Sequence, residues 1–102
     1  MAQFDVFQNP RAGVFSLLVD IQSDMLSRLQ TRVVVPMTTV KKLGAKPIGL
    51  LNPIVKVDGT EYVLVVQDLA SVPLSALSKR VTSVASKRAE IVAAIDLLVT
   101  GI

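Results

Sequence analysis

The chain has 102 residues, of which 51% are hydrophobic and 19% are charged, and its formal net charge is +3 at pH 7. This length suits one domain with its own core and is too short for two ordinary domains, so we expect a single domain over residues 1–102. Because cysteine and histidine are absent, the sequence excludes disulfides, thiolate or imidazole metal sites, and the Ser-His and Cys-His nucleophile pairs.

The first three segments favour strands. The run Gln3–Phe7 alternates and is ended by Asn9-Pro10, whereas Val14–Gln22 is apolar almost throughout and predicts a central strand covered on both faces. Arg32–Met37 contains three consecutive valines, which suit a pleated sheet. Pro36 has no N–H to donate, so this strand should bend or end there.

The middle of the chain mixes irregular and regular segments. Glycines and prolines punctuate Thr38–Pro53, which predicts a long excursion, either a small hairpin wing or a loop. Asp58-Gly59 separates two β-rich runs and predicts a type I′ hairpin turn. Residues 68–77 read as a connector with one helical turn after Pro73.

A helical period covers residues 81–99, with Thr82 or Ser83 as its N-cap and Gly101 releasing its end. The apolar stripe spans about 140° of the helix and should face the core; it consists of Val81, Val84, Ala85, Ile91, Val92, Ile95, Leu98 and Val99. Leu97 lies off this stripe and should face solvent or a partner. About five strands followed by one helix predict a mainly β protein, an antiparallel sheet or barrel with the helix across one face.

Composition also indicates partners. The apolar excess predicts that part of the surface, the helix stripe and part of the sheet, is buried in a homodimer. The basic residues are interrupted and only 4% of residues are aromatic, so the charge favours an acidic protein partner over nucleic acid. No segment is apolar enough for a membrane span, and the first residues are too polar for a signal peptide, which predicts a cytoplasmic protein with no membrane partner.

The stretch Gln22-Ser23-Asp24 has the residue types of a hydrolytic site, but no base completes it. We therefore expect a turn there, in which Asp24 caps the residues that follow. We predict no catalytic residue, no metal site and no cofactor.

Five strings, in this order, resemble the CcdB toxins, the gyrase-poisoning halves of toxin–antitoxin pairs. They are VDIQSD (19–24), RVVVP (32–36), LNPIVKVDG (51–59), DLASVP (68–73) and AAIDLLVTGI (93–102). The resemblance runs from Gln3 to Ile102 without large gaps.

The resemblance implies a homodimer of SH3-like, five-stranded barrels, each followed by a long C-terminal helix near the two-fold axis. The paired C-termini would enter the cavity between the two A subunits of DNA gyrase and hold the cleaved DNA complex open. A cognate antitoxin with a disordered acidic tail would extract the toxin. DNA would be reached only through the antitoxin complex, in transcriptional autoregulation.

The resemblance also implies which residues contact gyrase. The family usually ends in Trp-Gly-Ile, which Gly101 and Ile102 match and Thr100 does not. From the residues alone, this ending could instead be a helix stop with one isoleucine packed into the core.

Further gyrase contacts are implied at the adjacent apolar residues Met25 and Leu26, at Asp96, where the family usually has an uncharged amide, and at the neighbouring Leu97. One of Met25 and Leu26 could equally be an ordinary core residue.

Two other functions remain open on sequence grounds. RNA-cleaving toxins of the MazF and Kid type share the barrel and dimer, and Asp20 or Asp24 with Arg11 or Arg32 could supply the base and cation of such a site. The other is a non-toxic relative that binds antitoxin alone. RNA cleavage and bacterial growth assays separate the three.

Overall fold

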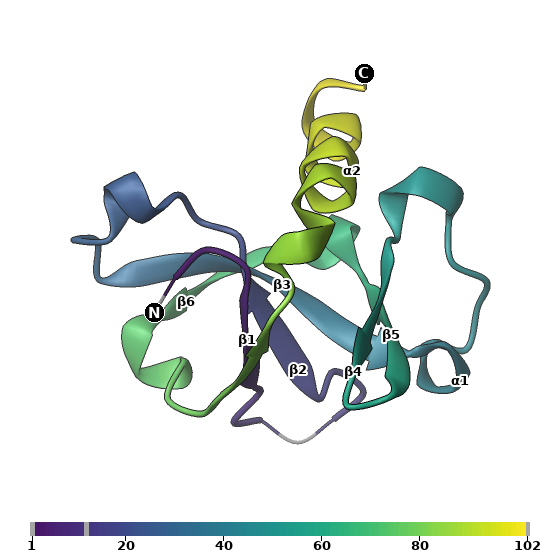
Figure 1. The fold of residues 1–102 in the computed structure, drawn as a ribbon, viewed down its shortest axis with the longest axis horizontal. Coiled ribbons are helices and arrows are strands. Elements are labelled where there is room, and N and C mark those ends of the chain that lie inside the picture. The colour runs from purple at the N-terminus through teal and green to yellow at the C-terminus, as the bar shows by residue number, and fades with distance from the viewer. Residues whose placement is uncertain (1, 12, 102) are drawn as a thin grey trace.

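The computed structural model describes residues 2–11 and 13–101, which form one curled antiparallel sheet and a C-terminal helix (Figure 1). The strands are β1 (Asp5–Gln8), β2 (Leu17–Asp20), β3 (Thr31–Thr39), β4 (Ile54–Val57), β5 (Thr60–Leu64), β6 (Ala70–Pro73) and β7 (Arg80–Ser83). The helices are α1 (Val40–Leu43) and α2 (Arg88–Thr100), with short 3-10 turns η1 (Asp24–Leu26), η2 (Gly49–Leu51), η3 (Val66–Asp68), η4 (Leu74–Ala76) and η5 (Ala85–Lys87).

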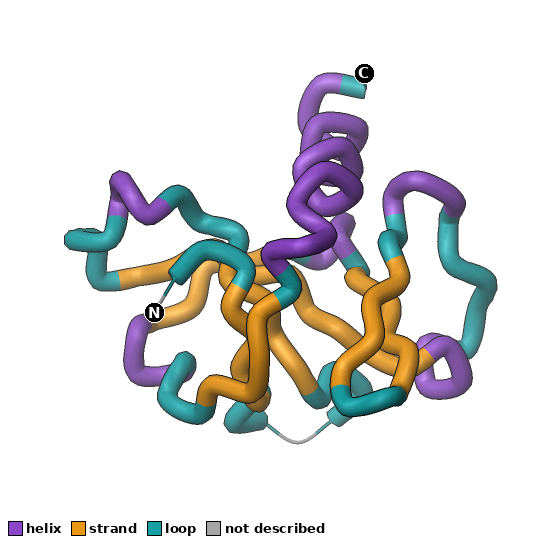
Figure 2. The backbone as a smooth tube through the Cα atoms, in the orientation of Figure 1, coloured by secondary structure: helices purple, strands orange, loops and turns teal. Residues whose placement is uncertain are grey.

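The sheet has the order β4-β5-β3-β2-β1-β7, and β6 pairs with β3 beside this path. One edge of β3 pairs with β2, while its other edge pairs first with β6 over residues 31–34 and then with β5 over residues 37–39. Since β3 changes partner midway, the sheet wraps around itself as a half-barrel (Figure 2). The mainly β, antiparallel fold class predicted from the sequence is confirmed.

Pro36 neither ends β3 nor interrupts it, contrary to one of the two predicted outcomes. It lies between the part of β3 that pairs with β6 and the part that pairs with β5, where its carbonyl accepts a hydrogen bond from Val65 N at 2.9 Å. A proline is tolerated at this change of partner because no neighbouring strand needs an N–H there.

The central strand β2 is buried on both faces, as its continuous apolar sequence predicted. The main core lies on the face that α2 covers and includes Val6, Val19, Val35, Met37, Leu64, Val66, Ile91 and Ala94. A smaller cluster lies on the other face and contains Phe7, Leu18, Val34 and Leu77. Successive side chains of β1, β2 and β3 point to opposite faces of the sheet, so each of these strands contributes to both clusters.

The predicted helix over 81–99 begins too early. Residues 80–83 form β7, which pairs with β1 through Asp5↔Ser83 and Val6↔Thr82. The valine and threonine of β7 suit a strand, and pairing with a partner strand overrides a helical stripe that arises by coincidence of spacing. Ser83 Oγ accepts from Ala85 N at 3.2 Å, but the N-cap position of α2 is Lys87, so neither Thr82 nor Ser83 caps this helix.

Gly101 does end α2, as predicted. Its φ is 74°, in the left-handed region that glycine adopts without strain, and its N–H donates to the carbonyl of Leu97 at 3.1 Å.

The excursion after β3 contains no hairpin wing. It consists of α1, an exposed loop with Lys46, and η2, and the buried side chain of Asn52 holds its end. Asn52 accepts from Ile48 N at 2.8 Å and donates to Leu64 O at 3.1 Å. The glycines and prolines predicted correctly that this segment is irregular, but they could not decide between a paired hairpin and a loop.

The Asp58-Gly59 turn is confirmed, with φ of 50° and 79° at its two central residues and Val57 paired with Thr60. The helical turn after Pro73 is also confirmed, as η4. The rest of that connector is the strand β6, which the sequence analysis missed. No helix among residues 2–11 and 13–101 has the length and apolar character to cross a membrane.

Candidate protein-interaction site

Two of the exposed apolar surfaces carry residues that the sequence indicated as contacts. The apolar turn is η1 with the residues after it, and it exposes 93% of Met25 and 51% of Leu26. The helix end is Leu97–Val99, where exposure rises from 37% at Leu97 to 71% at Val99. In Figure 1 both project toward the upper side of the molecule, away from the loop that joins β1 and β2.

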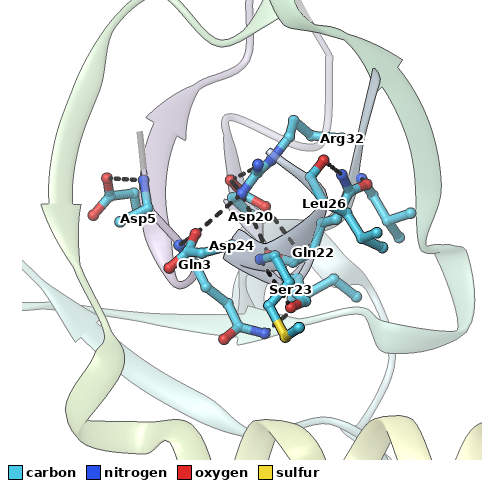
Figure 3. A network of polar contacts seen from close by, with 12 residues as sticks. Gln3, Asp5, Asp20, Gln22, Ser23, Asp24, Leu26 and Arg32 are labelled. Carbon is cyan, nitrogen blue, oxygen red and sulfur yellow. Dashed lines mark hydrogen bonds and ion pairs between the residues drawn. The ribbon is translucent and has the colours of Figure 1, made fainter. Parts of the chain in front are cut away.

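A buried ion pair supports the apolar turn from below. Asp20 and Arg32 have side chains 0% and 1% exposed, and Arg32 Nη2 lies 2.7 Å from Asp20 Oδ2. Arg32 Nε donates to the same oxygen at 2.9 Å (Figure 3). Asp20 is paired with Val34 in the register of β2 and β3, and Arg32 lies two residues before Val34 on β3, so the strand pairing brings the two side chains together diagonally.

Gln22 links this ion pair to the turn. Its backbone N donates to Asp20 Oδ1 at 3.0 Å, and its carbonyl accepts from Arg32 Nη2 at 3.3 Å. Its side chain then accepts from Val33 N at 3.1 Å and donates to the carbonyl of Leu26 at 3.1 Å. The exposed apolar residues are thus carried by a turn whose base is fixed by buried polar contacts (Figure 3).

The cap of η1 is Ser23, not Asp24 as predicted. Ser23 Oγ accepts from Met25 N at 3.2 Å. Asp24 instead points back toward the rest of the fold, where Oδ1 accepts from Gln3 N at 2.9 Å and lies 3.5 Å from Arg32 Nη2. The Asp24 carboxylate therefore binds groups outside the turn instead of capping the residues that follow it.

Burial raises the pKa of the Asp20 carboxyl above its ordinary value, and the nearby charge of Asp24 acts in the same direction. The Arg32 guanidinium and the backbone N–H of Gln22 lower the pKa, but burial has the larger effect. The contacts with Arg32 and Gln22 therefore offset only part of the free-energy cost of burying this carboxylate.

The helix end differs from the predicted stripe. Ile91 and Ala94 are buried and Val92 and Ile95 partly so, but Leu98 and Val99 are exposed, whereas the sequence placed both in the core. The helix leaves the sheet before its last turn, so its C-terminal residues have no core to face (Figure 1). Leu97 is exposed, as its position off the stripe predicted.

The remaining predicted contact residues extend this surface. Asp96 and Thr100 are exposed, and Thr100 Oγ1 donates to the carbonyl of Asp96 at 2.7 Å. The hydroxyl of Thr100 is thereby used inside the helix. Ile102 lies outside the described residues.

Met25 and Leu26 are both exposed, so neither is the core residue that the sequence left open. Leu29, which the sequence analysis did not single out, adds a third half-exposed apolar side chain to the same segment. The only indication of Leu29 in the sequence is that it follows the apolar pair Met25-Leu26 within an otherwise polar stretch.

The ribonuclease alternative is weakened by the burial of two of its four residues. Asp20 and Arg32 are paired with each other below the surface, where an RNA phosphate does not reach them. Arg11 belongs to the loop between β1 and β2. That loop lies on the other side of the molecule from the apolar turn (Figure 1). Across residues 2–11 and 13–101 no group of three or more Asp, Glu, His or Cys side chains could hold a metal ion.

The fold and its surfaces define a class: a small curled β-sheet domain with a projecting C-terminal helix and exposed apolar segments suited to binding other proteins. A family model described as CcdB protein matches residues 3–101. The chain therefore belongs to the CcdB family, whose members are toxins of toxin–antitoxin systems that poison gyrase and are not known as enzymes.

Proposed function

We propose that this chain binds the A subunits of DNA gyrase and traps the enzyme on cleaved DNA, and that a cognate antitoxin reverses this. Family membership over residues 3–101 supports the general role. The observation that carries the finer proposal is the exposed helix end, since apolar side chains at the tip of a rigid helix are suited to enter a pocket of a partner.

In this proposal the chain makes and breaks no bond. Met25, Leu26, Asp96, Leu97 and the terminal residues Thr100, Gly101 and Ile102 provide the contacts with gyrase. Leucine, methionine and isoleucine bury apolar area against the target, and Thr100 takes the place of a large aromatic hot spot. Gyrase would perform the DNA cleavage itself, and the bound toxin would slow religation.

Gyrase is two-fold symmetric, so we propose that the chain acts as a homodimer with both helix ends presented together. The hydrophobic fraction of 51% supports this, because a second copy would remove part of the apolar surface from water. Sedimentation of the purified chain should give the mass of two protomers. A monomer at concentrations that poison gyrase would contradict the symmetric arrangement.

We also propose that the antitoxin contributes a flexible acidic segment. The net charge of +3 supports an acidic partner, because opposite charge speeds association and offsets part of the ordering cost of a disordered segment. The complex with antitoxin, rather than the toxin alone, would bind operator DNA and regulate transcription. These events would take place in the cytoplasm, where gyrase works.

The test is a gel assay with purified gyrase, supercoiled plasmid and ATP. The intact chain should give linear DNA after protein denaturation, and a chain lacking residues 100–102 should not. Truncation is preferable to Gly101→Glu, because a side chain at a φ of 74° strains the helix end. No linear DNA from the intact, folded protein would contradict the proposal and favour the antitoxin-binding relative; RNA loss in a parallel tube would favour the ribonuclease.

A second arm tests the apolar turn. Met25→Ser with Leu26→Ser should raise the concentration needed for half-maximal cleavage by at least about tenfold, as expected when anchor residues are lost. Val14→Ser is the matched control, because Val14 is half-exposed, as Leu26 is, but lies in the loop between β1 and β2. Equal effects of the two changes would mean that the turn has no special part in binding.

A further inference from the structure

The first residue of α2 carries a charge of the wrong sign for its position. Arg88 begins the helix and follows Lys87, yet the N-terminus of a helix disfavours cations by its dipole. Lys87 occupies the N-cap position of α2, and its side chain makes no capping hydrogen bond. An arginine here needs some other favourable interaction.

That interaction is with the N-terminal segment of the chain. The Arg88 guanidinium carbon lies 5.7 Å from the centroid of the Phe4 ring, within range of a cation–π contact. Arg88 Nη1 also donates to Gln3 Oε1 at 3.4 Å. One side chain of the helix thus contacts two successive residues that precede β1.

Gln3 extends the link to the apolar turn. Its Nε2 donates to the carbonyl of Ile21 at 3.0 Å, and its backbone N donates to Asp24 Oδ1 at 2.9 Å. Figure 3 shows Gln3 beside Asp24 and Ser23. Gln3 therefore bonds to residues on both sides of Ser23, while its side-chain oxygen faces the helix.

Phe4 gives an independent sign that this junction is under constraint. Its φ is 70°, a conformation that a bulky residue rarely adopts, and its side chain is buried. The surroundings hold it there: its carbonyl accepts from Val84 N at 2.9 Å, and its N donates to Asp20 O at 2.6 Å. Such a residue persists where the surrounding structure fixes it, and here that structure joins β2 to the segment leading into α2.

We propose that Arg88 is a positioning residue: through Gln3 and Phe4 it fixes the apolar turn relative to helix α2. The two surfaces are carried by separate segments, and this relay of contacts holds them in one arrangement. The consequence for gyrase binding rests on the function proposed above, whereas the positioning itself does not.

The positioning is measured with a pair of spin labels. Because the chain has no cysteine, Ser27→Cys and Ala93→Cys give unique labels at exposed sites on the turn segment and the helix. Mixing with excess unlabelled chain restricts each measured distance to one protomer. Arg88→Ala should broaden the distance distribution, and Arg88→Lys, which keeps the charge but loses the planar guanidinium, should restore it only in part.

Lys87→Ala is the matched control, since it removes the same charge from the adjacent exposed residue. Its distribution should equal that of the parent. An unchanged distribution in Arg88→Ala, or equal broadening in Lys87→Ala, would overturn the proposal. Should Arg88→Ala fail to fold, Gln3→Leu interrupts the same relay from its other side and must give the broadening.

In the gyrase assay Arg88→Ala should raise the half-maximal concentration about two- to fivefold, the change in an equilibrium constant that a lost exposed cation–π contact gives. Broadening with unchanged potency would overturn the functional consequence. If the labels broaden as expected but the intact chain produces no linear DNA, the positioning stands and the proposed function fails. The two ideas therefore fail separately.

Discussion

Replacing Arg32 tests the buried ion pair most directly. Arg32→Met keeps most of the side-chain volume but leaves the Asp20 carboxylate, 0% exposed, without its guanidinium partner. Breaking a buried pair from one side costs about 3–5 kcal/mol. Since domains are stable by roughly 5–15 kcal/mol, this is a large part of the free energy of unfolding.

The double variant Asp20→Asn with Arg32→Met shows whether the loss of stability comes from the unpaired buried charge or from the removal of Arg32 itself. It leaves no buried charge and a polar side chain that still accepts from Gln22 N, so it should recover most of the lost stability. The measurement is urea unfolding by circular dichroism at equal protomer concentration, because a dimer is stabilised by mass action. A single variant that loses less than about 1 kcal/mol would refute the claim that the pair is buried and mutually dependent.

The pH dependence follows from the raised pKa of Asp20. A carboxyl whose pKa is higher in the folded state binds its proton more tightly when folded, so its contribution to stability is complete below the ordinary value of 3.8. That contribution is lost as pH rises through the folded pKa. The parent should therefore lose stability relative to the double variant between pH 3.8 and the raised value; a gain over this range would show that Arg32 outweighs burial.

Other changes probe the fold at single residues. Gly59→Ala should cost about 1–2 kcal/mol in urea unfolding because φ there is 79°, and no loss would mean that the turn relaxes. Ile91→Ala should cost about 2–5 kcal/mol, whereas Val99→Ala, at an exposed position, should change the free energy of unfolding by less than about 0.5 kcal/mol; equal losses would place the helix end in the core. Asn52→Ala should cost about 2–4 kcal/mol because it leaves the buried carbonyl of Leu64 and the N–H of Ile48 without their side-chain partner, and faster hydrogen exchange at the Ile48 amide is the check.

Local chemistry in the sequence was enough for the central strands, the Asp58-Gly59 turn and the glycine that ends α2. In each case the signal lies within a few residues: a continuous apolar run, a dipeptide suited to positive φ, or a glycine after a helix. The antiparallel class followed from the same local signals.

The errors share a different cause. Residues 80–83 are a strand only because β1, far away in the sequence, offers an edge, and β6 is a strand only because β3 does. Leu98 and Val99 follow the core stripe in periodicity, but the sheet that would cover them ends earlier. Periodicity reports which side chains share a face and says nothing of how far the opposite surface extends.

The candidate site was predicted unevenly for the same reason. Met25, Leu26 and Leu97 could be singled out from the sequence, and all three are exposed. The Asp20–Arg32 pair beneath the turn depends on the register between β2 and β3, and the contacts of Gln3 and Arg88 join residues at opposite ends of the chain. No spacing rule in one sequence indicates such pairs.

The pairing of β1 with β7 has a consequence for synthesis on the ribosome. Asp5 is opposite Ser83, so one edge of β1 stays unpaired until residue 83 has been made. A growing chain therefore carries an open strand edge, a site for mispairing, until β7 is available to pair with it. The segment that follows β7 is the one that leads into α2, so the helix end is completed only after the residues that close this edge.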